Sequence, residues 1–288
     1  MSPIIQDLDK MVQDVPAMPM VAQKVMHMLG DPRTTNSMLA DTLSADQALV
    51  SRILQMANSP FFGTRQRVSS ISGAIFILGH AALRSLVITV CTRGLFKHAA
   101  LMEEKLWEHS LGAASAAKEI AEKSGLLSPN EAFVSGLLHD IGKTSLAVVY
   151  REDFRNLFVR GYNDGLSMEE IMELEVREFG YDHCTIGARV LAKWRFPALF
   201  VRAARRHHVT DLDLIRSEES PEGLAIVGLA NLISSRIGLG RAEPDKRLDV
   251  INSIYNDLLK LDRPRILSIV ENTVRSYKEA REHFGLMV

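Results

Sequence analysis

Gly136-Leu137-Leu138-His139-Asp140-Ile141-Gly142-Lys143 places a His-Asp pair within an apolar segment. Apolar residues recur at helical spacing through 133–138, which predicts that the pair lies on or beside a buried face. A buried Asp140 needs a cation or a hydrogen-bonding partner, because an isolated charge is costly to remove from water. His139 and Asp140 can both ligate a metal from a helix end. Lys143, one turn beyond His139, is expected on the same face, where a cation suits a phosphate.

The same helical spacing extends in both directions from this segment. It covers residues 21–29, 46–57, 107–120 and a final helix that begins near Pro264. Residues 86–90 taken alone could form a buried strand, but no series of alternating strands joined by tight turns follows. We therefore predict an all-α protein.

The chain is expected to form two helical parts. Residues 1–100 contain several short helices broken by Pro and Gly, and residues 101–288 contain longer helices and most of the histidines. No Gly/Ser-rich or Pro-rich linker separates them near residue 100, so we expect one cooperative unit.

Composition excludes several classes of protein. The 288 residues carry a net charge of −1, which gives no evidence for nucleic-acid binding. Cys91 and Cys184 form no CxxC pattern, so we expect neither a disulfide framework nor a zinc knuckle. A chain without disulfides suits the reducing cytosol. No signal peptide is apparent, and residues 74–91 are interrupted by Gly79, which predicts a buried helix pair rather than a membrane span. A cytoplasmic location without a membrane is expected.

Four further histidines are candidate ligands. His109, His183 and the His207-His208 pair each fall on a predicted helix with small or apolar neighbours. Taken singly, each is more often a hydrogen-bonded core residue than a ligand. Imidazole and carboxylate together suit iron, manganese, zinc or nickel better than magnesium.

The order His, His-Asp, His, His-His resembles the HD superfamily of metal-dependent phosphohydrolases, especially its HD-GYP branch. That resemblance implies an HD-like helical bundle and one or two metal ions, with iron favoured. It implies ligand positions at His109, His139, Asp140, His183, His207, His208 and Asn231. At the last of these the superfamily normally has Asp, which is the better ligand, and the Gly-Tyr-Pro signature expected after the His pair is replaced by residues 209–211.

The N-terminal part resembles the HDOD family, the HD-related output domain. The matching motifs are Val15-Pro16-Ala17-Met18-Pro19, the segment 44–49, and Leu54-Gln55-Met56-Ala57-Asn58-Ser59-Pro60-Phe61-Phe62-Gly63. The combined resemblance extends over roughly residues 10–240. It implies an N-terminal helical HDOD subdomain and a role in bacterial signalling or regulation.

Two functions remain open at this point. The first is a metal-binding regulatory module whose partner is a signalling protein or a phosphate-containing small ligand. The second is a metal-dependent phosphohydrolase or phosphodiesterase, in which Asp140 bridges the metals and Lys143 stabilises phosphate charge. Asn231 and the missing Gly-Tyr-Pro favour the first and argue against efficient catalysis. The sequence leaves the oligomeric state and the number of metals open.

Overall fold

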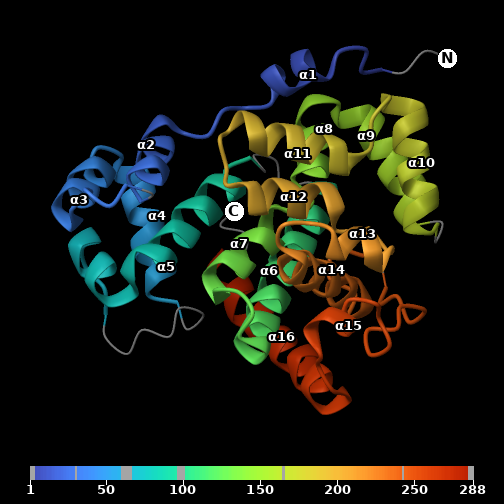
Figure 1. The fold of residues 1–288 in the computed structure, drawn as a ribbon. Helices are drawn as coiled ribbons and strands as arrows, with labels where there is room; N and C mark the ends of the chain where they lie inside the picture. The colour runs from blue at the N-terminus through green and yellow to red at the C-terminus, as the bar shows by residue number, and fades with distance from the viewer. Residues whose placement is uncertain are drawn as a thin grey trace. The chain divides into compact units, whose positions relative to one another are not determined.

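The computed structural model describes residues 4–29, 31–59, 67–95, 101–163, 166–241 and 243–284 (Figure 1). Within these ranges every regular element is a helix, which confirms the all-α prediction, including for residues 86–90. Gly30, the Pro60-Phe61-Phe62-Gly63 end of the second HDOD motif and the predicted boundary at residue 100 lie outside them.

The chain divides into two compact units. Unit 1 comprises residues Met1–Pro16 and Phe96–Val274, and unit 2 comprises Ala17–Leu95 and Arg275–Val288. The division falls within the last helix, α16 (Arg263–Phe284), which begins where the sequence pattern around Pro264 predicts.

Unit 2 is built mainly from four helices. They are α2 (Met20–Met28), α3 (Asn36–Ser44), α4 (Gln47–Ala57) and α5 (Ile71–Arg93). Asp46 caps α4 as predicted, because its carboxylate accepts a hydrogen bond from the Leu49 N–H at 2.9 Å. Helices α3 and α4 both pack on α5, which contributes more buried apolar residues than any other helix of the unit.

Helix α5 is the one described helix that is long and apolar enough to cross a membrane. In the structure 61% of its most apolar window is buried. Gly79 has φ 77°, so the helical path breaks there and two helical stretches follow one another. These features match the predicted buried helix pair.

Unit 1 contains the remaining helices. They are α1 (Leu8–Asp14), α6 (Leu101–Ser124), α7 (Pro129–Leu138), α8 (Ile141–Val149), α9 (Arg151–Phe158), the π-helical turn η2 (Val159–Asn163), α10 (Met168–Phe179), α11 (His183–Lys193), α12 (Ala198–Arg206), α13 (Leu212–Arg216), α14 (Pro221–Arg236), α15 (Asn256–Leu259) and the first part of α16.

The core of unit 1 forms where α6 packs against α7 and α14. Small residues make this packing close: Ala113, Ala114, Ala116 and Ala117 of α6 are fully buried. A Cβ added at Gly136 of α7 would lie 2.6 Å from the Ala113 carbonyl oxygen, so only glycine fits there. The close approach brings the C-terminal end of α7, which carries the His-Asp pair, against the middle of α6.

Candidate metal centre

The candidate ligands of unit 1 lie mostly at helix ends. His139 follows the last residue of α7, and Asp140 precedes the first residue of α8. His183 begins α11, and His207 and His208 follow the end of α12, whereas His109 and Asn231 lie within α6 and α14. The ends of several helices can converge on one site, and this brings side chains from distant parts of the sequence close together.

The helix predicted to run on from His139 to Lys143 is interrupted instead. Asp140 has φ −99° and ψ 20°, so α7 ends and α8 begins there. Lys143 lies in the first turn of α8, and its Nζ donates a hydrogen bond to Asp140 Oδ2 at 2.8 Å. The expectation of one shared helical face was wrong, although the lysine does lie beside the His-Asp pair.

Asp140 is the centre of the cluster, and its two carboxylate oxygens face different histidines. Oδ1 lies 3.3 Å from His207 Nε2 and 3.4 Å from His183 Nε2. Oδ2 lies 3.5 Å from the Nε2 atoms of both His109 and His139. Two ligand atoms each about 2.0–2.1 Å from a tetrahedral metal are separated by about 3.3–3.4 Å. The spacing therefore suits a carboxylate that reaches one ion on each side.

Several buried polar atoms of the cluster have no hydrogen-bond partner among the described residues. They are His139 Nε2, Asp140 Oδ1, His207 Nε2 and His208 Nε2. Buried polar atoms are almost always paired, so a group of unpaired atoms turned to one place is the arrangement that a cation would satisfy. Burial holds the pKa of His139 and His208 well below the usual range, so both rings are neutral and carry a free lone pair. The residues present fit a metal.

A charged pair accompanies the histidines. The side chains of Asp140 and Lys143 are 3% and 2% exposed, so neither charge is solvated by bulk water. Burial alone would raise the pKa of Asp140, but the Lys143 ammonium 2.8 Å away outweighs it and holds that pKa well below its usual value. The carboxylate is thus ionised and available as a ligand.

A second layer of hydrogen bonds orients the rings. His183 donates from its backbone N–H and its ring Nδ1 to Glu175 Oε2, at 2.9 and 2.6 Å. The Nδ1 atoms of His139 and His207 lie 2.7 and 3.0 Å from the carbonyl oxygens of Gly136 and Ala204. Such bonds favour the tautomer in which Nε2 would be free to face a metal, as is usual for metal-binding histidines.

Glu175 was missed in the sequence. It is fully buried on α10, although Glu is a residue that rarely enters a core unpaired. Its one sequence signal is its position on the apolar side of the α10 pattern, between Ile171 and Phe179, which are also fully buried. That pattern predicts that the Glu175 carboxylate is buried, but it does not predict which residue the carboxylate contacts.

Asn231 lies at the cluster as the resemblance implied. Its Oδ1 is 2.9 Å from His109 Nε2, and its Nδ2 is 3.4 Å from His208 Nδ1. Burial lowers the pKa of His109 to about 4, so this ring is neutral. A proton on Nε2 would donate to the Asn231 oxygen, whereas a proton on Nδ1, 3.3 Å from the Leu239 carbonyl oxygen, would leave the Nε2 lone pair for a metal. The amide fills the position with a neutral group that links α14 to α6.

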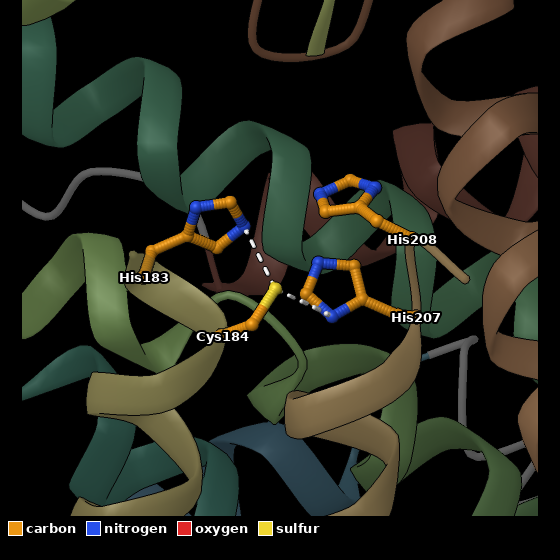
Figure 2. Close-up of side chains that lie close together, drawn as sticks. All are labelled: His183, Cys184, His207 and His208. Carbon is orange, nitrogen blue, oxygen red and sulfur yellow. Dashed lines mark hydrogen bonds between the residues drawn. The ribbon is translucent and has the colours of Figure 1, made fainter. Parts of the chain in front are cut away.

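Cys184 was not among the ligands that the sequence predicted, and the structure places it among the histidines (Figure 2). Its Sγ lies 3.5 Å from His183 Nε2 and 4.0 Å from His207 Nδ1. Burial alone would raise the pKa of this thiol, but His183 and His207 outweigh it and lower the pKa to about 6. Both cysteines are free, as the absence of a disulfide framework predicted.

A pocket opens beside Asp140 and His109. Its lining combines cations with apolar and small residues: Lys105, Leu106, His109, Asp140, Lys143, Phe158, Met168, Ser235, Gly240 and Arg241. Lys105 is paired with Glu108 at 2.8 Å and Arg241 with Asp245 at 3.5 Å, whereas Lys143 contacts Asp140. The pocket reaches Asp140 and His109 from one side of the cluster.

The described residues form an all-helical fold with a buried His/Asp cluster. The HDOD domain family matches residues 15–210, and the chain belongs to this family. A curated relative, an uncharacterised protein of Treponema pallidum (strain Nichols), is 24% identical over 200 residues. The match covers 68% of this chain but only 38% of that relative.

Solved structures share the fold. An HDOD domain protein of unknown function from Geobacter sulfurreducens gives a TM-score of 0.80 at 24% identity, covering 98% of this chain and all of that one. A candidate phosphohydrolase from Shewanella amazonensis SB2B gives 0.74 at 22%, covering 98% and 99%. A candidate signal-transduction protein from Marinobacter aquaeolei VT8 gives 0.72 at 21%, and the likeness covers 98% of this chain and 61% of that one.

Proposed function

We propose that this chain is a metal-binding regulatory HDOD protein of bacterial signal transduction, in which the metal centre serves a ligand- or protein-binding output rather than efficient hydrolysis. One observation carries the metal part of the proposal. The Nε2 atoms of His139, His183 and His207 lie 3.3–3.5 Å from the Asp140 carboxylate, a spacing that suits shared metal ligands, and the buried Nε2 atoms of His139 and His208 have no hydrogen-bond partner.

The residues would divide between two metal positions. Asp140 Oδ2 lies with His109 and His139, and Oδ1 lies with His183 and His207. When bound, such ions supply positive charge that polarises a phosphoryl oxygen or holds an anionic ligand. Asp140 would hold both ions and, with Glu175 behind His183, keep the imidazoles in place.

Asn231 supports a regulatory role over a catalytic one. An amide contributes no negative charge, so a metal held near His109 is more weakly bound and the site keeps a higher net positive charge than with a carboxylate. A positively charged site holds an anionic ligand well. It lacks the carboxylate that offsets the metal charge in the hydrolases. A signalling protein or a phosphate-containing small molecule is therefore the partner we propose.

A second candidate function is metal-dependent phosphodiester hydrolysis. Lys143 favours it, because its ammonium lies in the lining of the pocket beside Asp140 and can contact a phosphate oxygen there. In this alternative Lys143 stabilises charge that develops on the phosphoryl group, and Asp140 bridges the metals.

Elemental analysis followed by a substrate screen separates these functions. The full chain, purified without chelator, is expected to contain about one to two equivalents of iron, manganese, zinc or nickel. The loaded protein is then tested against cyclic and linear phosphodiesters, where we expect turnover near background. Robust turnover of a cyclic dinucleotide would favour the enzyme. A protein that cannot be loaded with any of the four metals would contradict both functions.

A further inference from the structure

His183, Cys184, His207 and His208 form a compact group in unit 1 (Figure 2). Each offers one ligand atom, and these atoms all lie within 4.8 Å of one another. Two helix ends bring them together: the start of α11 supplies His183 and Cys184, and the residues that follow the end of α12 are His207 and His208. Packing of α11 against α12 sets the distance between these helix ends.

We propose that Cys184 is a metal ligand, and that its sulfur joins His183, His207 and His208 in binding a borderline or soft divalent cation such as zinc or iron(II). The inference deepens the proposed function and rests on it. It adds a sulfur ligand to a site for which only nitrogen and oxygen ligands were expected.

The distance between sulfur and nitrogen supports a shared ion. Ligand atoms about 2.3 Å (sulfur) and about 2.0–2.1 Å (nitrogen) from a tetrahedral metal lie about 3.5 Å apart. Cys184 Sγ and His183 Nε2 are separated by 3.5 Å. No movement of either side chain is then needed for both atoms to contact one ion.

The ring nitrogens supply an independent observation. The buried Nε2 of His208 has no hydrogen-bond partner, and that of the fully buried His207 has only the Asp140 carboxylate, 3.3 Å away. Figure 2 shows the two rings converging with His183 and the sulfur on a common space. A thiol that only donated a hydrogen bond to His183 would leave the His208 nitrogen unexplained.

The ligand set determines which cation fits. A thiolate with imidazoles suits zinc, iron(II), cobalt(II) or nickel, whereas magnesium and manganese prefer oxygen. The His109, His139 and Asp140 group offers nitrogen and oxygen only. The two positions should therefore differ in the metal they prefer. Binding converts the Cys184 thiol to a metal-bound thiolate, and its proton leaves to solvent.

Cobalt(II) titration of the metal-stripped full chain tests the inference. A sulfur–cobalt bond gives charge-transfer absorption in the near-ultraviolet, and cobalt held by any protein ligands gives visible bands. We expect both in the natural chain. Cys184→Ser should lose the near-ultraviolet band, keep visible bands from the other position, and bind zinc about tenfold or more weakly. Circular dichroism checks that this variant is folded.

Cys91→Ser is the matched control. Cys91 is the one other cysteine, is also buried, and belongs to α5 of unit 2, so its replacement should leave both sets of bands unchanged. If Cys184→Ser does not fold, the Cys91→Ser protein decides alone, since only Cys184 can then provide a thiolate.

Three results would overturn the inference. Visible bands without near-ultraviolet absorption in the natural chain would show that metal binds without Cys184, leaving the proposed function intact. Persistence of the near-ultraviolet band in folded Cys184→Ser would assign it elsewhere. Absence of all cobalt bands would refute the metal function as well.

Discussion

At the scale of single residues, Asp140 organises the site. Its two oxygens contact opposite sets of histidines, while Lys143 neutralises its charge at 2.8 Å. Removing either partner of such a buried pair leaves an uncompensated charge, which typically costs about 3–5 kcal/mol. Asp140 therefore affects both stability and metal binding. It would be a metal ligand, and when no metal is bound it needs the Lys143 cation to remain buried.

Replacement of His139 tests the metal centre most directly. His139 is fully buried, and its Nε2 is unpaired, 3.5 Å from Asp140 Oδ2. His139→Ala removes that ligand, so bound metal measured by elemental analysis should fall by about one equivalent or be lost. His27→Ala is the control, because His27 is exposed on α2. Equal metal content in both folded variants would refute a role for His139 as ligand.

Asn231→Asp restores the carboxylate that HD hydrolases normally have. Metal affinity, measured by titration calorimetry, should rise about tenfold, since the added negative charge lies beside His109. Slow phosphodiester hydrolysis could accompany it.

The metal-free form of this variant should be less stable, because it buries an extra charge. Added metal should therefore raise its Tm by more than it raises that of the natural chain. Asn231→Leu, which adds no ligand, should not gain affinity. A gain of similar size in Asn231→Leu would show that the amide acts by sterics rather than by charge.

At the scale of elements, two close approaches position the ligands. Helix α8 packs on α11 at Gly142 and Gly187, where a Cβ on Gly142 would overlap the His183 carbonyl oxygen. Tyr255 lies against Gly228 of α14, and its hydroxyl reaches the carbonyl oxygens of His207 and Val209, each at 3.1 Å. Both contacts tie the backbone of a candidate ligand to a neighbouring helix.

Gly142→Ala should separate α8 from α11. The overlap is with backbone, which cannot rotate away, so we expect a loss of about 1–3 kcal/mol or more in the free energy of unfolding. Metal affinity should fall as well, because His183 is displaced from Asp140. Denaturant unfolding and metal titration measure the two effects.

Gly73→Ala provides the comparison for this glycine. Gly73 lies in the first turn of α5, where the nearest atom to an added Cβ is the Ser70 hydroxyl at 3.1 Å. This change should alter stability by less than about 1 kcal/mol and leave metal binding unchanged. If Gly142→Ala behaves in the same way, the helix contact does not constrain the site.

At the scale of the whole molecule, each compact unit draws on two separate segments of the chain. Unit 1 combines residues 1–16 with 96–274, and unit 2 combines 17–95 with 275–288. A single cut near residue 100 therefore yields two fragments, neither of which contains a complete unit. This topology is an independent reason to expect that the chain unfolds as one.

Thermal unfolding followed by calorimetry tests that expectation. We expect one transition, with the calorimetric and van't Hoff enthalpies equal. Metal at about one hundred times its Kd should stabilise the folded chain by about 2.7 kcal/mol and move the transition upwards, reversibly with chelator. Two well-separated transitions, together with protease release of a folded fragment near residue 103, would contradict cooperative folding.

The sequence by itself determined the helical class, the family and the order of the candidate ligands. These depend on local information: helical spacing along 107–120, the cap at Asp46, and the histidine motifs are all contained within short segments. The break between α7 and α8 at Asp140 was not evident, because apolar spacing continues across it.

Only the tertiary structure decided which side chains meet. Glu175 and His183 lie eight residues apart on different helices, and Cys184 reaches His207 only because α11 packs on α12. Periodicity predicts the buried side of each helix but not the partner it faces, since the crossing of two helices depends on side chains from both. For this reason the sequence predicted the histidine ligands, whereas the packing of the helix ends revealed the Cys184 sulfur and the Glu175 carboxylate beside them.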